Sequence, residues 1–267
     1  MPILGLIAGN RSFSLYAARS AKAQGYEVVA VGLKEEIDPA LEREVSRMFW
    51  VSFSEIGRVP ELLKEAGVRD VLLAGQIRPE RLLKGEGQWD GVVRQLLNLM
   101  PDRSGNSAMK IAVQTLEGKG FRVLHSGTFL KHWIPEPGTL TRRAPRPEEQ
   151  ADLRFGMKLA RKLADLGIGQ TLVVKHLAVA AVEALEGTDE AIRRAGRLAG
   201  PGCVAAKACE SDHDMRFDIP VVGPETVRAM KEAGVGCLGL EAGRVLLLNR
   251  PELISAADDA GLAMVAF

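Results

Sequence analysis

Short apolar runs that end in glycine alternate with amphipathic stretches through the first half of the chain. Residues 3–9 form one such run, ending at Gly9, and residues 70–75 form another, ending at Gly75. A short, continuous apolar run is typical of a strand buried on both faces of a parallel sheet. Further strands are predicted at 27–32, 48–53 and 121–125, and helices at 12–25, 54–67, 89–100 and 107–119. This alternation predicts an α/β domain, residues 1–130, with a mostly parallel sheet.

The character of the chain changes at residues 131–148, which are rich in proline and arginine. Prolines at this density are incompatible with a helix or an inner strand, so the stretch is interpreted as an interdomain linker. Its arginines, Arg142, Arg143 and Arg146, are interpreted as solvated charges. Beyond it, strands are predicted at 171–174, 179–183, 204–207, 215–221, 236–240, 245–248 and 263–267, and helices at 148–166 and from residues 189, 224 and 252. Residues 149–267 are therefore predicted to form a second, catalytic α/β domain.

Polar and apolar residues alternate strictly in the segment Asp214-Met215-Arg216-Phe217-Asp218. On a strand, Met215 and Phe217 would face the core, while Asp214, Arg216 and Asp218 would share the other face. A row of surface ion pairs would have the same pattern. However, Gly223-Pro224 opens a helix shortly afterwards, and carboxylates beside a helix N-terminus suit a divalent metal and a phosphate. The three charged residues are therefore candidate catalytic residues, and Asp218 is also a candidate metal ligand.

A second group of candidates lies at residues 182–189. Turn and cap chemistry accounts for Thr188 and Asp189 at the start of a predicted helix. It accounts less well for Glu183, because a glutamate at the end of an apolar strand is costly to bury unless it is paired or bound to a metal. Glu183 and Glu186 are therefore candidate metal ligands, and Thr188 and Asp189 are candidate substrate contacts.

Further candidates for substrate binding flank the predicted strands. Gln170 and Thr171 precede one strand, and Lys175 and Lys207 could neutralise phosphate charge, although an isolated lysine is more often simply solvated. Gly9 and Gly75 close parallel strands, where a ligand can approach the backbone. The chain lacks the full glycine fingerprint of a dinucleotide-binding loop, which weakens the case for NAD.

Composition narrows the class of protein. The formal net charge is only +1, which gives no support to a nucleic-acid-binding role. The three cysteines form no CxxC pair and are predicted to be small buried hydrophobes in a reducing compartment. No apolar run approaches the roughly 20 residues needed to span a bilayer, so a cytoplasmic location is expected. The four histidines show no HxxxH spacing, and there is no GxSxG motif.

Several segments, in the same order along the chain, resemble a family of UDP-2,3-diacylglucosamine pyrophosphatases from Gram-negative bacteria. This family is the one that is unrelated to the calcineurin-like phosphoesterases. The matching segments are DMRFDIPVVG at 214–223, IGQT at 168–171, VEALEGTD at 182–189, GLIAG at 5–9, LAG at 73–75, GLEAG at 239–243 and AAD at 256–258. The resemblance implies a Rossmann-like N-terminal domain and a distinct C-terminal domain. It also implies Mg²⁺-dependent hydrolysis of UDP-2,3-diacylglucosamine to UMP and 2,3-diacylglucosamine 1-phosphate in lipid A synthesis. The family's essential aspartate falls on Asp218, which would bind Mg²⁺ or orient the attacking water.

The chain departs from the family pattern at two places. Residues 210–213 replace a stretch that resembles Lys-Pro-x-Gln, and Gln76 stands where a lysine is usual. A catalytically silent or differently specific nucleotide-sugar-binding relative therefore stays open. An NAD(P)-dependent oxidoreductase is the other alternative, but residues 31–34 offer no acidic residue to close the second strand. The resemblance also implies a homodimer, and the diacyl chains of the substrate imply transient contact with the inner membrane.

Overall fold

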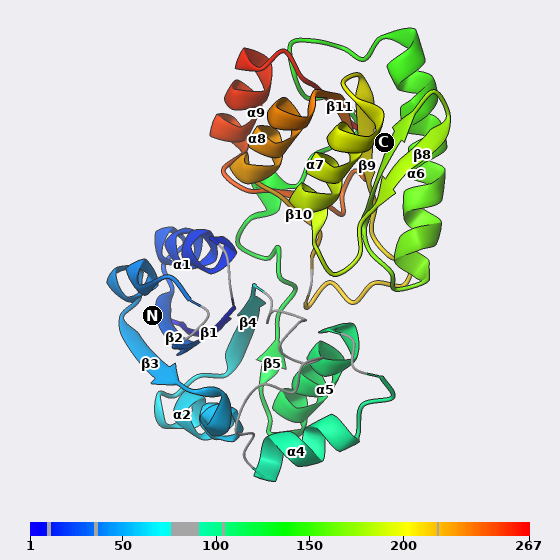
Figure 1. Ribbon diagram of the computed structural model, residues 1–267. Helices are drawn as coiled ribbons and strands as arrows, with labels where there is room; N and C mark the ends of the chain where they lie inside the picture. The colour runs from blue at the N-terminus through cyan, green and yellow to red at the C-terminus, as the bar shows by residue number, and fades with distance from the viewer. Residues whose placement is uncertain (10–11, 35–36, 76–90, 103–104, 218) are drawn as a thin grey trace. The chain divides into compact units, whose positions relative to one another are not determined.

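The computed structural model describes residues 1–9, 12–34, 37–75, 91–102, 105–217 and 219–267 (Figure 1). The chain folds into two compact units. Unit 1 consists of Met1–Leu130 together with Asp214–Asp218, and unit 2 consists of Lys131–His213 together with Ile219–Phe267. A short segment from late in the sequence therefore completes the first unit.

Unit 1 is a parallel α/β layer. Its five strands lie in the order β3-β2-β1-β4-β5, and every neighbouring pair is parallel. Its elements are β1 (Ile3–Ala8), α1 (Phe13–Ala23), β2 (Glu27–Leu33), η1 (Pro39–Glu44), β3 (Arg47–Val51), η2 (Phe53–Arg58), α2 (Val59–Glu65), β4 (Asp70–Ala74), α4 (Gly91–Asn98), α5 (Gly105–Gly118) and β5 (Arg122–Val123). The predicted parallel α/β domain is confirmed, and its order, which reverses between β1 and β4, is that of a Rossmann-like sheet.

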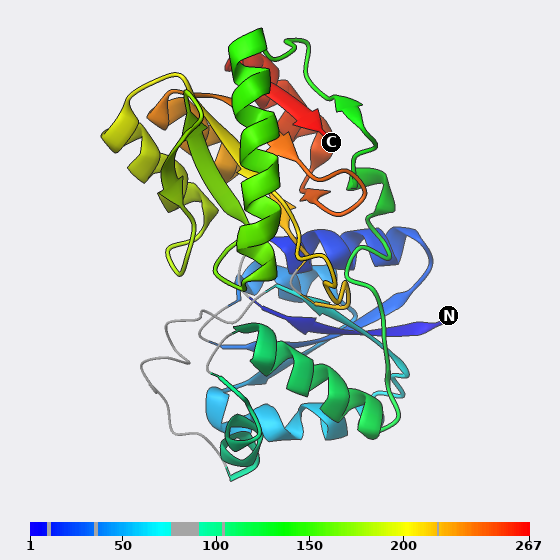
Figure 2. The same ribbon diagram turned by 90° about the vertical axis from the view of Figure 1, so that its right-hand side faces the viewer.

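Helices cover both faces of this sheet. Helix α1 lies on one face, and α2, α4 and α5 lie on the other (Figure 2). Buried side chains of the strands pack with Leu63 of α2 and with Val113 and Leu116 of α5. The apolar runs read from the sequence are therefore buried on both sides, as a doubly covered parallel sheet requires.

Unit 2 has a mixed six-stranded sheet, in the order β6-β13-β11-β9-β7-β8, and a separate parallel pair, β10-β12. Strands β9, β11 and β13 are parallel, and β6, β7 and β8 join by antiparallel pairing. Its elements are η3 (Lys131–Trp133), β6 (Gly138–Thr139), α6 (Pro147–Asp165), β7 (Thr171–Lys175), β8 (Ala178–Val182), α7 (Thr188–Ala199), β9 (Cys203–Lys207), β10 (Val221–Val222), α8 (Pro224–Ala233), β11 (Val235–Leu240), β12 (Leu246–Leu247), α9 (Arg250–Asp259) and β13 (Ala263–Ala266).

The two faces of the unit 2 sheet are covered differently. Helix α6 covers one face alone, while α7, α8 and α9 cover the other (Figure 1). All three cysteines are free and buried in this unit, as the sequence predicts, and burial raises the pKa of the Cys237 thiol to about 12. Among the residues that the structure describes, no helix is both long and apolar enough to cross a membrane.

The predicted linker at 131–148 is instead part of unit 2. Strand β6 pairs with the edge of β13, and α6 already begins at Pro147. No helix forms at residues 134–146, where the prolines disfavour one, but an edge strand requires only a few free amides.

The arginines of this stretch are not all solvated charges. Arg143 Nη1 lies 2.7 Å from Glu149 Oε2, and Arg146 Nη2 lies 2.9 Å from Glu149 Oε1. Burial alone would raise the pKa of Glu149, but hydrogen bonds from Arg143 and Arg146 outweigh it and lower that pKa to about 2. Arg142, in contrast, is largely exposed, as predicted.

Candidate functional site

The segment that contains Asp214 is a turn rather than the predicted strand. The amide of Phe217 donates to the carbonyl of Asp214 at 3.2 Å, and the amide of Arg216 donates to Asp214 Oδ1 at 3.1 Å. An aspartate side chain that accepts from the amide two residues on stabilises a turn, and this local bond competes with strand pairing. The alternating pattern had correctly identified Phe217 as buried and Asp214 and Arg216 as neighbours, but not the backbone that joins them.

Arg216 forms a cluster with two carboxylates, called here the Arg216 cluster. Its Nη2 lies 2.6 Å from Asp214 Oδ2, and its Nη1 lies 2.5 Å from Glu117 Oε1 on α5. The hydrogen bonds that Arg216 donates to Asp214, and then those that it donates to Glu117, raise the pKa of Arg216. The guanidinium therefore holds Asp214 and Glu117 in place, and its donors are largely committed within the protein.

Ser126 attaches the turn to unit 1. Its amide donates to the carbonyl of Met215 at 2.8 Å, and its hydroxyl donates to the carbonyl of Arg216 at 2.9 Å and to that of Leu73 at 3.2 Å. The side chain of Phe217, only 5% exposed, packs into the core beside Leu73 and Val123. The turn is therefore fixed where β4 and β5 end. Sequence reasoning missed Ser126 and Glu117, because nothing in one sequence links them to residues about 90 positions later.

Gly9 and Gly75 lie at the same edge of the sheet. The amide of Gly9 donates to the carbonyl of Ala74 at 2.8 Å, and Gly75 adopts a φ of 104° that only glycine tolerates well. These glycines follow β1 and β4, between which the strand order reverses, and open α/β sheets bind ligands at that point. Asp218 and Gln76, which continue the two segments, lie outside the described residues. This carboxyl edge of unit 1 is the candidate site.

Unit 2 contains a separate buried polar cluster, called here the Lys207 cluster. Lys207 Nζ lies 2.9 Å from Thr188 Oγ1, 3.2 Å from Thr171 Oγ1 and 3.8 Å from Glu183 Oε2. Thr171 and Lys207 face each other in the register of β7 and β9. The structure thus brings together four of the predicted site residues, three from β7, α7 and β9 and the fourth, Glu183, from the residue that follows β8.

The Lys207 cluster is internally satisfied. The three donors of the ammonium group face two hydroxyls and a carboxylate. Glu183 also accepts from the Thr188 hydroxyl at 3.0 Å and from the amide of Gln170 at 3.3 Å. Glu183 is therefore the counter-ion of a buried lysine, which resolves the cost of its burial without a metal ion.

The remaining predicted residues of unit 2 are dispersed. Lys175 lies at the opposite end of β7, where its Nζ donates to the carbonyl of Ala199 at 2.6 Å. Asp189 accepts from the Thr226 hydroxyl at 2.8 Å. Glu186 pairs with Arg194 at 2.5 Å. Each of these side chains has a local structural partner, so the geometry does not gather them with the Lys207 cluster.

Glu241 is a polar residue that sequence reasoning missed. It follows β11, is only 7% exposed, accepts from the amide of Cys209 at 2.8 Å and pairs with Arg161 at 3.1 Å. Glu183 was selected as a glutamate within the end of an apolar strand, whereas Glu241 directly follows the strand predicted at 236–240; extending the criterion by one residue would have found it. The hydrogen bond from the amide of Cys209 to Glu241 fixes the residue that precedes segment 210–213, which departs from the family pattern.

That segment is also fixed by other contacts. Arg244 Nη2 donates to the carbonyl of Glu210 at 2.6 Å, and His213 Nδ1 lies 3.7 Å from Glu210 Oε2. The side chain of His213 is only 2% exposed. The side chain of Glu210 therefore faces a histidine, and an arginine of unit 2 holds its backbone.

A metal site is not evident. Across the part of the chain that the structure describes, no three His, Cys, Asp or Glu side chains gather closely enough to hold a metal ion. Glu183 and Glu186, the predicted ligands, each face a different cation. The described residues therefore do not fit a Mg²⁺ site built on these two glutamates.

Comparisons with known proteins cover nearly the whole chain. The model of the LpxI N-terminal domain matches residues 3–133, and that of the LpxI C-terminal domain matches residues 136–265. The UDP-2,3-diacylglucosamine pyrophosphatase LpxI of Caulobacter vibrioides is 32% identical over 97% of this chain and 95% of its own length. Among solved structures, the biotin carboxylase domain of Hydrogenobacter thermophilus 2-oxoglutarate carboxylase is 12% identical. It aligns with a TM-score of 0.29 over 73% of this chain and 41% of that chain.

Proposed function

This chain belongs to the LpxI family, and we propose that it hydrolyses the pyrophosphate bond of UDP-2,3-diacylglucosamine, releasing UMP and 2,3-diacylglucosamine 1-phosphate. The observation that carries this proposal is the match of both domain models in order, together with 32% identity to a pyrophosphatase over 97% of the chain. The protein is accordingly a hydrolase of phosphoric anhydride bonds that acts in lipid A biosynthesis.

The carboxyl edge of unit 1 is the proposed site for the reaction. Gly9 and Gly75 flank the point at which the sheet order reverses, where backbone can approach a nucleotide phosphate. The turn fixed by Ser126 and Phe217 leads directly to position 218. We propose Asp218 as the catalytic residue, with Arg216 as a positioning residue that acts by holding Asp214 and the turn in place.

Mg²⁺ is the proposed cofactor, on the grounds of the reaction itself. A pyrophosphate diester is negatively charged and repels hydroxide, and a divalent ion would screen that charge. The committed pairing of Glu183 and Glu186 argues against those two residues as ligands. The dependence of UMP release on Mg²⁺ is therefore the measurement that tests this cofactor.

The experiment is to incubate the purified protein with UDP-2,3-diacylglucosamine and follow UMP release. Wild-type turnover is expected to be lost in Asp218→Ala and after chelation, and to return when Mg²⁺ is added back. Asp259→Ala is the matched control, because this carboxylate on α9 is 74% exposed and belongs to none of the segments proposed for the site. Failure of the wild-type protein to release UMP with Mg²⁺ present would refute the proposed activity.

A second candidate is a nucleotide-sugar-binding relative without turnover, favoured by the Glu210 and His213 pair where the family carries a basic stretch. Calorimetric binding of UDP-2,3-diacylglucosamine without UMP release would establish it. Tight binding of NADH would instead revive the oxidoreductase alternative.

A homodimer, and a cytoplasmic location with peripheral contact at the inner membrane, are further proposals. The dimer rests on the family resemblance, and membrane contact rests on the two acyl chains of the proposed substrate. Sedimentation velocity over a range of protein concentrations tests the dimer.

A further inference from the structure

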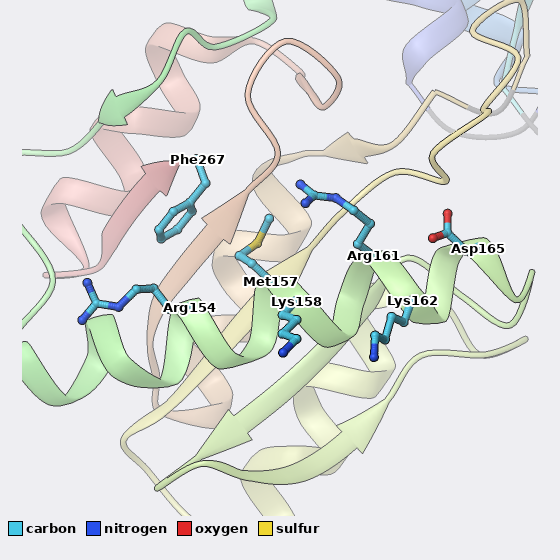
Figure 3. Close-up of a pocket in the computed structure, with 7 residues that line it drawn as sticks. All are labelled: Arg154, Met157, Lys158, Arg161, Lys162, Asp165 and Phe267. Atoms are coloured by element: carbon cyan, nitrogen blue, oxygen red, sulfur yellow. The ribbon is translucent and has the colours of Figure 1, made fainter.

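The outer face of α6 carries a stripe of cations. Arg154, Lys158, Arg161 and Lys162 recur at helical spacing and line one groove of about 420 Å³ in unit 2 (Figure 3). Asp165, at the end of the stripe, is the one acidic side chain that lines the groove. We call this surface the α6 basic groove.

Most of these cations are available for an external partner. Arg161 pairs with Glu241 at 3.1 Å. Among the described residues, no carboxylate oxygen lies within 4.0 Å of the charged nitrogens of Arg154, Lys158 or Lys162. Asp165, in turn, accepts a hydrogen bond from the amide of Ser211 at 2.7 Å. The groove therefore presents an excess of positive charge that the described part of the protein does not neutralise.

The groove also has an apolar floor. Met157 and the ring of Phe267 line it together (Figure 3), and both pack over Gly239 of β11. A Cβ at position 239 would come within 3.2 Å of Phe267 Cε2 and 3.3 Å of Met157 Sδ, so the glycine makes room for them. Phe267 remains 39% exposed. The groove thus combines cations with an accessible aromatic ring.

Apolar exposure continues beyond the end of α6. Leu166 is 73% exposed and Ile168 is 50% exposed, although both follow a helix whose other face is buried in the core. Lysine and arginine beside exposed aromatic and aliphatic side chains suit the boundary between lipid headgroups and acyl chains. A nucleic acid would be expected to need a wider basic surface, and the formal net charge is only +1.

We propose that the α6 basic groove docks this protein on a membrane surface that contains anionic phospholipids. The cations contact headgroup phosphates, while Phe267, Leu166 and Ile168 lie against the interfacial region. The proposal deepens the proposed function, on which it rests for its purpose, because a substrate with two acyl chains partitions into such a surface.

The test is co-sedimentation of the full chain with vesicles, without substrate. The protein is expected to bind vesicles of phosphatidylcholine mixed with phosphatidylglycerol, and to bind pure phosphatidylcholine vesicles much more weakly. Each basic residue near such a surface contributes about fivefold in affinity, so the triple variant Arg154→Gln, Lys158→Gln, Lys162→Gln should bind on the order of 100-fold more weakly. High salt should release the wild-type protein.

The matched control removes three exposed cations elsewhere on unit 2, in Arg197→Gln, Arg228→Gln, Lys231→Gln. Thermal unfolding shows whether each variant is folded. Equal losses in both triple variants would overturn the proposal, as would equal binding to neutral vesicles. Displacement from vesicles by inorganic phosphate at low concentration, or preferred binding of an RNA oligonucleotide, would also overturn it.

Activity on detergent-dispersed UDP-2,3-diacylglucosamine separates this proposal from the proposed function. The groove variant should release UMP from dispersed substrate at the wild-type rate and lose rate only on vesicle-embedded substrate. If the groove variant no longer binds vesicles but still hydrolyses dispersed substrate, docking is supported. If the wild-type protein releases no UMP from dispersed substrate, the proposed activity is refuted, whereas the vesicle-binding result still stands.

Discussion

The Arg216 cluster of unit 1 and the Lys207 cluster of unit 2 contain similar groups in different surroundings. Each places a cation beside at least one carboxylate. The side chains of Lys207 and Glu183 are 3% and 12% exposed, whereas those of Arg216 and Glu117 are 36% and 44% exposed. One cluster is therefore desolvated and the other remains in contact with water.

This difference in burial indicates different roles for the two clusters. Removing one partner of a buried ion pair leaves an uncompensated charge and costs several kcal/mol, whereas an exposed pair contributes about 0–1 kcal/mol. The Lys207 cluster is accordingly expected to determine the stability of unit 2. The Arg216 cluster is expected to contribute little to stability and to act mainly by positioning the turn before residue 218.

The largest expected effect on stability is that of Lys207→Met. It leaves Glu183 buried without its cation and should lower the free energy of unfolding by about 3–5 kcal/mol. Urea unfolding measures the loss, and hydrogen exchange at the amides of β9 locates it. The double variant Lys207→Met, Glu183→Gln should recover part of the loss. A cost below about 1 kcal/mol would mean that burial does not distinguish the two clusters.

Glu149→Gln tests a buried carboxylate that is paired with guanidinium groups instead of an ammonium group. The pKa of Glu149 is about 2 in the folded protein, below its ordinary value of 4.5. Because the folded pKa is the lower one, this stabilisation is complete above pH 4.5 and is lost as the pH falls towards 2. The variant should be less stable by about 3 kcal/mol at neutral pH.

Urea unfolding of Glu149→Gln and wild-type protein across that pH range is the measurement. The difference between them should shrink as the pH falls. A difference that does not depend on pH would mean that packing, and not the charge of Glu149, supplies the stability.

Arg216→Met is expected to show the opposite balance. Its pairs are partly exposed, so the free energy of unfolding should fall by only about 1 kcal/mol. UMP release should fall by about 100-fold, because misplacing a positioned group by about 1 Å has that effect on rate. Arg216→Lys should recover stability more fully than rate, since an ammonium group cannot reproduce the bidentate contact with Asp214. A large loss of stability would place this residue with the structural cluster.

Lys175→Met should give the smallest effect. This lysine caps carbonyls at the end of α7 from the opposite end of β7, and such a cation contributes about 0.3–1 kcal/mol. Unfolding in urea measures the loss, and the variant is also the matched control for Lys207→Met. A loss as large as that of Lys207→Met would show that removal of any lysine from this sheet is equally damaging.

The strands are the most predictable part of the fold, because short apolar runs in the local sequence indicate which residues are buried. The runs ending at Gly9 and Gly75 are placed correctly, and the strand predicted at 179–183 corresponds to β8, which ends one residue earlier, at Val182. The segment at 214–217 was misread because strict alternation also fits a turn with one buried side chain. The hydrogen bond from the amide of Arg216 to Asp214 Oδ1 favours the turn over the strand. The sequence contains the signal for this bond, which is an aspartate two residues before the amide that donates to it.

The candidate site was only partly predictable. Glu183, Thr171, Thr188 and Lys207 were each selected individually, but the residues alone did not predict that they meet in one closed network. The partners of Arg216 and of the turn, Glu117 and Ser126, depend on tertiary contacts across long sequence separations. Hydrophobic periodicity cannot predict such contacts, because it indicates which face of an element a residue occupies and not which distant residue it contacts.

The late contribution of Phe217 to the core of unit 1 has a consequence for biosynthesis. The rest of unit 1 has been synthesised once the ribosome reaches Leu130, but the side chain that fills its core beside Leu73 is made only after much of unit 2. At typical elongation rates the nascent first unit waits several seconds with that position unfilled. Its last packing step therefore waits for synthesis of much of the second unit, and so does completion of the turn that leads to the proposed site.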